Sequence, residues 1–352
     1  LNEPTIDWRK IPVFLEAIRM HGNRHGYPFI ETGLDSISME GDTIQCRLVI
    51  NRGDFYVWDT VYVKGNDALH QRTAQHFLGI KPGKPFNIEV IEGMQNNLGA
   101  LDFISQRRKP GIVFTQDGKV RIILELEKES TGVFNGIAGI LPDAANQNKL
   151  TLTGELSLNL TNSFGRAEEF SANWNGIKGS QVLEINYMQP YLYTLPFGIR
   201  YRFDLFKKDT TYIRLSQRAG LSYRIRHGSY LTAFYNYGNS RILNRELFDN
   251  ITTLPPYSDY NVNRFGLEFR YLMLNYPRNP RKGYLINLEG SAGQKKLITG
   301  SDIPSELFEG IDVKTSQLQT RWDLQYFVPL FKKTTLKLMS MGGAKISSQL
   351  FE

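Results

Sequence analysis

The sequence predicts an α+β region followed by an all-β antiparallel transmembrane β-barrel. Three observations support this fold class. From Leu150 onward apolar and polar residues alternate in stretch after stretch, the polar positions carry many charges, and no run of about 18 apolar residues could form a membrane-spanning helix. Alternation with a period of two places apolar and charged side chains on opposite faces of a strand, as barrel strands between lipid and water require.

The stretch 212–226 shows this alternation most clearly. Its arginines share one face, and residues such as Leu215 and Leu221 occupy the other. An unpaired buried charge is too costly for a dry core, so the arginine face should meet water while the apolar face meets lipid. The same alternation assigns five basic residues to a water-filled lumen: Arg200, Arg202, Arg214, Arg218 and Arg224.

Composition agrees with a barrel and argues against other classes. Aromatic residues make up 12% of the chain, which suits the aromatic girdles of an outer-membrane barrel. The net charge of +7 would suit nucleic acid, but the basic residues are spread along strands and turns, so no nucleic-acid partner is predicted. The single cysteine, Cys46, excludes an intramolecular disulfide and lies on a predicted strand, where we expect a packed, unreactive thiol.

The residues before the barrel form two predicted α+β units, 1–53 and 54–130. The expected elements of the first unit are a helix at 11–20, ended by glycines, and strands at 29–39 and 43–50. The expected elements of the second unit are a strand at 54–64, a helix capped by Asp67 that runs to residue 78, a helix at 87–101, and a hairpin of strands 112–115 and 119–128.

Residues 131–352 form the predicted barrel, with about eleven strands. They are expected at 132–141, 149–162, 168–177, 180–190, 197–206, 211–225, 229–240, 261–273, 284–295, 313–328 and 334–345. The connections at 241–260 and 296–312 are long, and most others are short. Outer-membrane barrels have short periplasmic turns and long outer loops, so both long connections are predicted to be extracellular.

Short phrases along the chain point to a family. In the N-terminal region they are His-Gly-Tyr-Pro-Phe at 25–29, Val-Lys-Gly-Asn at 63–66 and Lys-Pro-Gly-Lys-Pro-Phe at 81–86. In the barrel they are turns that contain Phe164 and Gly165, Pro190 and Tyr191, and Asn279, Pro280, Arg281 and Gly283. The chain thereby resembles the BamA/TamA-type outer-membrane assembly factor superfamily over essentially its whole length. The resemblance implies POTRA domains, the first of them partial, and a bacterial surface antigen-type β-barrel.

The same resemblance implies a barrel of about sixteen strands, whose sixth outer loop docks a V/I-R-G-F/Y motif inside the lumen. This sequence stops at Glu352, where that loop would begin. An open barrel would leave two unpaired strand edges in lipid. We therefore expect about 11 of 16 strands to be present and the barrel to be incomplete at its C-terminus.

The first barrel strand is rich in glycine, and glycines weaken a strand. In the family that the chain resembles, this strand closes a lateral seam with the last strand, and a client strand pairs with its edge. The predicted lateral-gate residues are Gly132, Val133, Phe134, Asn135, Gly136, Ile137, Ala138 and Gly139. The alternative is that these glycines only relieve crowding at the barrel floor.

The implied function is a factor that folds or translocates client β-barrel proteins through this seam, in the outer membrane of a Gram-negative bacterium with POTRA units in the periplasm. Implied partners are unfolded outer-membrane clients, the lipid bilayer, lipopolysaccharide, periplasmic chaperones and accessory lipoproteins. Two alternatives remain open: a passive transporter (a two-partner secretion-type pore or a porin) and the transport half of a patatin-like fusion. No enzymatic activity, cofactor or metal is predicted, because His21 and His25 lack a third ligand and the glycines at 132–139 precede no phosphate-binding Lys-Ser/Thr pair.

Overall fold

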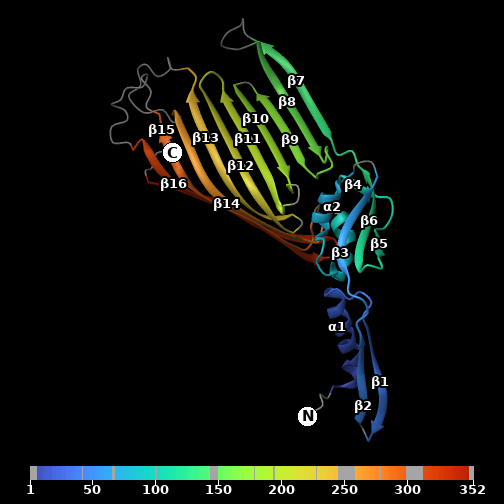
Figure 1. Cartoon of the computed structure of the whole chain (residues 1–352). Coiled ribbons are helices and arrows are strands. Elements are labelled where there is room, and N and C mark those ends of the chain that lie inside the picture. Colours follow the sequence, from blue (N-terminus) through green and yellow to red (C-terminus); the bar gives the residue numbers. More distant parts are fainter. Residues whose placement is uncertain are drawn as a thin grey trace. The chain divides into compact units, whose positions relative to one another are not determined.

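The computed structural model divides the chain into two compact units, Leu1–Glu129 and Ser130–Glu352 (Figure 1). It describes all residues except 1–5, 42, 66–67, 100, 143–149, 178, 193–194, 227, 245–257, 277–278, 299–311 and 349–352. No helix in this described part of the chain combines the length and the apolar character needed to cross a membrane. The predicted division of the first unit at residue 53 stays a prediction.

The first unit opens with a helix and a hairpin. A short 3-10 helix, η1 (Trp8–Lys10), leads into α1 (Ile11–Arg24), and β1 (Glu31–Glu40) pairs antiparallel with β2 (Thr43–Asn51). The helix continues four residues beyond the predicted end at residue 20, because Gly22 lies inside it, packed under the side chain of Ile30. The expectation for Cys46 was wrong: every residue of β2 is exposed, and the thiol is exposed with them.

The remainder of the first unit is a small sheet with two helices. Its elements are β3 (Val57–Lys64), α2 (Gln71–Leu78), α3 (Ile88–Gly99), β4 (Ile104–Gln106), β5 (Gly111–Phe114) and β6 (Lys119–Lys128). Strand β6 is central, parallel to β3 on one side and antiparallel to β5 and β4 on the other. Alternate residues of β6 are fully buried, namely Val120, Ile122, Leu124 and Leu126. They form the core of this part together with Val61, Phe86, Met94 and Leu98.

Three details of this part differ from the prediction. Helix α2 begins at Gln71 after an N-cap at His70, whereas Asp67, the predicted cap, lies outside the described residues. Strand β3 begins at Val57 instead of residue 54, because Tyr56 exchanges backbone hydrogen bonds with Gly26 and Phe86 instead of entering the ladder. Strand β4 was not predicted, since three residues are too few to show an alternating pattern.

The β5–β6 hairpin has the predicted turn at 116–118, and its charge is locally neutralised. The Nζ atom of Lys119 lies 2.7 Å from Oδ2 of Asp117. A hydrogen bond from Lys119, with a second from Thr115, lowers the pKa of Asp117 to about 2. The Asp117 carboxylate therefore stays charged beside Lys119 at pH values well above 2. On the same strand, Arg121 donates to Asp59 of β3 at 2.6 Å and ties the parallel pair together.

The second unit is one antiparallel sheet of eleven strands in the order in which they follow in the sequence. The strands are β7 (Val133–Pro142), β8 (Leu150–Thr161), β9 (Glu169–Ile177), β10 (Ser180–Gln189), β11 (Phe197–Lys208), β12 (Tyr212–Arg226), β13 (Ser229–Ile242), β14 (Tyr260–Leu274), β15 (Gly283–Leu297), β16 (Lys314–Phe331) and β17 (Thr334–Ser347). All eleven predicted strands are confirmed, with their ends shifted by about three residues or fewer. Figure 1 shows the sheet curving from β7 to β16.

Because every strand is antiparallel to the next, successive connections fall at alternate ends of the sheet. The β13–β14 and β15–β16 connections are therefore at the same end, as predicted. At the opposite end, Arg281 in the β14–β15 turn donates through Nη1 to the carbonyl of Lys332 in the β16–β17 turn, at 2.7 Å. The chain also enters β7 at this end, where Thr131 donates to the carbonyl of Thr161. We call it the short-turn end and the other the long-loop end.

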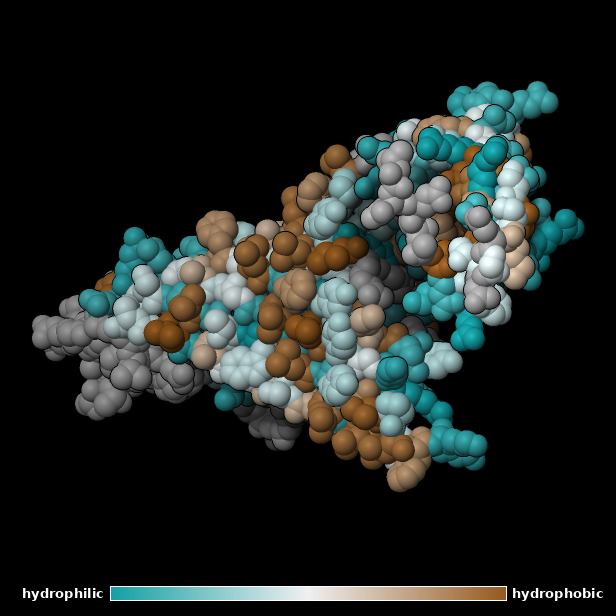
Figure 2. All heavy atoms as spheres, turned by 90° about the horizontal axis from the view of Figure 1, so that it is seen from below, coloured by the Kyte–Doolittle hydropathy of each residue, from teal (hydrophilic) through white to brown (hydrophobic). Residues whose placement is uncertain are grey.

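The two faces of this sheet have opposite character. On β13, the polar residues Thr232, Asn236 and Ser240 are buried, while Leu231 and Tyr235 on the other face are exposed. Large apolar side chains are exposed over the same convex face on neighbouring strands, as brown patches in Figure 2 also show for part of the surface. A soluble protein would place these side chains inside, because exposed apolar patches of this extent favour association. An apolar outer face and a polar inner face are typical of a barrel in lipid.

Candidate functional site: the concave face and the edge strand β7

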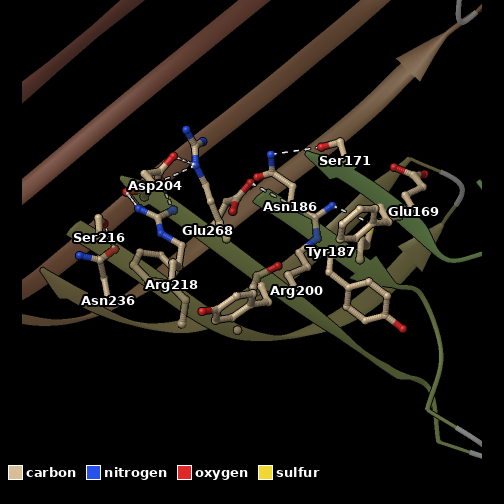
Figure 3. A pocket seen from close by; sticks show the side chains of 18 of the residues that line it. Glu169, Ser171, Asn186, Tyr187, Arg200, Asp204, Ser216, Arg218, Asn236 and Glu268 are labelled. Carbon is tan, nitrogen blue, oxygen red and sulfur yellow. Dashed lines mark hydrogen bonds and ion pairs between the residues drawn. The ribbon is translucent and has the colours of Figure 1, made fainter. Parts of the chain in front are cut away.

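The polar face of the sheet is concave. A single cavity of about 710 Å³ is lined by residues from β8 through to β16, which is possible only if that face curves around it. Figure 3 shows side chains from several strands converging in it, with Asn186, Arg200, Asp204, Arg218 and Glu268 among those labelled. We call it the central cavity.

A bidentate ion pair in the central cavity joins strands that are not neighbours. Arg218 of β12 donates from both terminal nitrogens to the two carboxylate oxygens of Glu289 on β15, at 2.9 and 3.0 Å. Arg321 of β16 approaches the same carboxylate at 3.9 Å. Paired guanidinium-carboxylate bonds of this kind are strong and fix orientation. They connect residues across the intervening strands β13 and β14.

A second contact crosses the concave face between β11 and β14. The guanidinium of Arg200 on β11 stacks on the ring of Tyr230, with its central carbon 3.5 Å from the ring centroid, and reaches Glu268 of β14 at 3.9 Å. The hydroxyl of Tyr230 donates to the same carboxylate at 3.2 Å. Arg202 pairs with Asp204 on its own strand at 2.9 Å. The central cavity therefore holds charges of both signs, largely paired with one another.

The structure brings together three of the five basic residues that the sequence assigned to a lumen. Arg200, Arg202 and Arg218 line the central cavity, and Arg214 lines a neighbouring cavity on the same concave face. Arg224 lines neither cavity and stacks 5.7 Å from the ring of Tyr191. The acidic partners Glu268 and Glu289 were missed, although both stand at polar-face positions of strands whose alternation was recognised.

The turn that contains Phe164 and Gly165 is held by side chains from within it. The side-chain oxygen of Asn162, a fully buried residue, accepts from the amide of Ala167 at 2.9 Å. The buried carboxylate of Glu168 accepts from the amides of Phe164 and Arg166, at 2.6 and 3.1 Å. Because both acceptors bond backbone amides, these contacts stabilise the turn that connects β8 with β9.

The other two turn motifs lie at the same short-turn end. Tyr191, after Pro190, is buried, and its carbonyl accepts from Gln189 at 2.8 Å. In the β14–β15 turn, which holds Asn279, Pro280, Arg281 and Gly283, the side-chain oxygen of Asn275 accepts from the amides of residues 281 and 282. All three motifs are therefore structural turns, and none of them lines the central cavity.

The predicted lateral-gate residues lie on β7, except that Gly132 precedes the strand. Among the described residues β7 pairs with β8 alone, in continuous register from Val133 to Pro142. Its side chains are exposed on both faces, with Phe134 and Ile137 exposed by 69% and 74%. Within the described part of the chain, strand β7 is thus held by β8 and by little side-chain packing.

No described residues form a cluster of three or more His, Cys, Asp or Glu side chains that could hold a metal ion. His21 and His25 stack with ring centroids 4.2 Å apart, and Nδ1 of His25 hydrogen-bonds the carbonyl of His21 at 2.7 Å. That contact occupies one ring nitrogen in the helix end, in keeping with a capping role.

Comparisons with known proteins agree on the fold. Residues 162–351 match the Omp85 superfamily domain. Among solved structures, the chain is similar to BamA from Haemophilus ducreyi lacking POTRA domains 1–3, with 15% identity, 97% of this chain and 65% of that chain covered, and a TM-score of 0.51. It is also similar to CdiB from Acinetobacter baumannii (11% identity, 98% and 62% covered, TM-score 0.53) and to CdiB from Escherichia coli (14% identity, 97% and 63% covered, TM-score 0.51). The chain thus spans less than two thirds of the length of these structures, and no curated protein sequence matches it.

Proposed function

The chain belongs to the Omp85 superfamily, and from that premise we propose that it is an outer-membrane assembly factor that inserts client β-barrel proteins through a lateral seam at β7. One observation carries the proposal: β7 contains Gly136 and Gly139, and large side chains such as Phe134 and Ile137 are exposed, so little side-chain packing holds this strand in a sheet whose apolar convex face suits lipid. Backbone N–H and C=O groups on a free edge can accept an incoming strand. The action needs no catalytic residue and no cofactor.

The proposal places the first unit in the periplasm as POTRA-like domains. Support comes from the second part of this unit, where β3 is followed by two helices, the short strand β4 and the β5–β6 hairpin. The second half of β3 pairs with β6 alone among the described residues and so presents an edge. An edge of this kind can receive an extended client segment by strand addition. The proposed partners are accordingly unfolded clients, periplasmic chaperones and accessory lipoproteins, with lipid and lipopolysaccharide around the barrel.

The orientation can be tested with cysteines at described positions of the two sheet ends. In a Cys46→Ser background, which removes the exposed native thiol, we expect a membrane-impermeant maleimide on intact cells to label Thr210→Cys and to leave Lys282→Cys unlabelled. Thr210 lies in the β11–β12 turn at the long-loop end, and Lys282 at the short-turn end, which barrels keep in the periplasm. Labelling of position 282 without 210 would reverse the assignment.

The seam itself can be tested by locking it. A disulfide that joins a cysteine at Asn135 or Ile137 to the strand that closes against β7 in the full-length barrel should abolish client insertion, and reduction should restore it. The matched control joins Asn135 to Ser157, its register partner on β8, which ties two strands that remain paired and should leave insertion intact. Insertion is read from the change in gel migration of a client barrel on heating.

A second candidate function, passage of substrate through the lumen, is favoured by the polar lining of the central cavity. The seam lock separates the two functions, because transport through the lumen requires no strand to part. If the disulfide-locked protein acts on its substrate as well as the reduced protein does, the result would support transport through the lumen and reject the seam.

A further inference from the structure

A second cavity of about 580 Å³ lies on the concave face toward the long-loop end, beside the central cavity. Five basic side chains from five strands line it: Arg214 of β12, Arg264 of β14, Lys295 of β15, Arg321 of β16 and Lys345 of β17. No carboxylate is among its described lining residues. We call it the basic cavity. It differs in this respect from the central cavity, where acidic and basic side chains pair.

The charges of the basic cavity are only partly compensated. The nearest acidic group that the ion pairs reveal is Glu289, which is engaged by Arg218 and lies 3.9 Å from Arg321. In the described part of the chain, neither Lys295 nor Lys345 forms an ion pair, and their two charges repel each other. The ammonium of Lys295 instead lies 4.7 Å from the ring centroid of Tyr260. Like charges gathered without a counter-charge attract anions strongly.

An independent observation points to a ligand in the same place. Gln317 of β16 lines the basic cavity and is only 4% exposed, yet its Nε2 atom has no hydrogen-bond partner. Its register partner on β17, Ser347, also has a buried hydroxyl without a partner. Buried polar groups are nearly always satisfied, so an orphaned amide donor in a basic cavity indicates an acceptor that completes it.

The strand between Arg264 and Gln317 carries a glycine at their level. In the register of the sheet, Gly293 of β15 stands between Arg264 and Gln317. A side chain there cannot be accommodated, since an added Cβ would lie 1.9 Å from the carbonyl oxygen of Asn263. No side chain at position 293 therefore lies between the guanidinium of Arg264 and the amide of Gln317.

We propose that the basic cavity binds a phosphate-type oxyanion, held by Lys295, Lys345 and the arginines and completed by the Nε2 donor of Gln317. The lining offers donors and positive charge without carboxylates, which suits a doubly charged group with several acceptor oxygens better than a single carboxylate. The phosphate can be carried by a soluble solute or by a phosphorylated lipid headgroup. This site is separate from β7 and does not depend on the proposed seam.

The test is titration calorimetry of the full-length protein in neutral detergent with inorganic pyrophosphate, at about 150 mM salt so that diffuse surface attraction is screened. We expect one saturable site that weakens by about tenfold or more in Lys345→Gln and in Gln317→Leu, each of which removes a donor to a charged group. Gln317→Leu conserves size and removes an unsatisfied buried group, so the barrel should fold, as its gel migration without heating will show.

The matched control is Lys337→Gln, on the same strand as Lys345. Lys337 lies 5.7 Å from the ring centroid of Phe327 and does not line the basic cavity, so the same loss of charge should change affinity by about twofold or less. The proposal would be overturned if neither pyrophosphate nor the lipid A probe described below bound saturably. It would also be overturned if Lys337→Gln and Lys345→Gln lost affinity equally.

A parallel titration with diphosphorylated lipid A in mixed micelles separates the two sources. Variant-sensitive binding of pyrophosphate assigns the site to a soluble phosphate, and variant-sensitive binding of lipid A alone assigns it to a headgroup. Either result supports the oxyanion site itself.

Discussion

Replacing Phe86 by alanine is expected to destabilise the first unit by about 3–5 kcal/mol, the usual cost of emptying a buried aromatic site. Phe86 is 1% exposed and packs against Trp58, with ring centroids 5.1 Å apart, and against Phe114 at 5.7 Å. It also receives and donates backbone hydrogen bonds that join the opening helix region to the small sheet, through Gly26 and Tyr56. The cavity left behind would therefore lie where several elements of this unit meet.

The loss of stability is measured by titrating the full chain with urea and using proteolysis of the first unit as the readout. The barrel is expected to resist urea concentrations that unfold a small soluble unit. The matched control is Ile112→Ala on β5, which removes an apolar side chain that is 38% exposed and should cost less than about 1 kcal/mol. Equal losses from the two substitutions would show that Phe86 is not part of a cooperative core.

Replacing Leu221 by arginine should destabilise the barrel in phospholipid vesicles by about 2–4 kcal/mol if the residue lies near the bilayer midplane. Leu221 is 53% exposed on the convex face, between Ile199 and Ala233 in the register of the sheet. A guanidinium there would replace a lipid contact with a charge that lipid cannot solvate. The measurement is the unfolding equilibrium in vesicles as guanidinium chloride is added.

Substitutions on the opposite face supply the comparison. Arg202→Gln removes an exposed guanidinium whose partner, Asp204, keeps access to water, so its cost should stay below about 1 kcal/mol. Arg218→Gln should cost more than Arg202→Gln, because it leaves Glu289 without its bidentate partner. If Leu221→Arg costs no more than Arg202→Gln, the convex face does not meet lipid.

The strands could be predicted and their long-range contacts could not, for a physical reason. Side-chain alternation is a local property of the backbone, so it marks each strand in the order of the residues; 180–190, for example, was predicted and Ser180–Gln189 is observed. The pair Arg218 and Glu289 is separated by 71 positions and forms only because the sheet curves. The spacing of residues along one strand does not indicate how strongly the sheet curves.

The exposed thiol of Cys46 shows the other limit. A strand pattern indicates which residues share a face, but it does not indicate whether another layer covers that face. In the hairpin of β1 and β2, no residue of β2 is buried, so the residue type that is most often buried in proteins is exposed here. The position of an element within the sheet layers decides burial, and single-strand periodicity does not contain it.

The cross-strand contacts of the central cavity have a mechanical consequence. The contact of Arg218 with Glu289 links β12 to β15, and the contact of Arg200 with Glu268 links β11 to β14. Each contact therefore crosses the concave side of the curved sheet and bridges two intervening strands. Flattening the sheet between β11 and β15 would lengthen both side-chain contacts, whereas bending it further would compress them. The strands β11 to β15 therefore resist a change in the curvature of the sheet. Among the described strands, a change in curvature is therefore expected outside β11 to β15, and β7 to β10, next to the edge where the proposed seam lies, are part of that unbraced region.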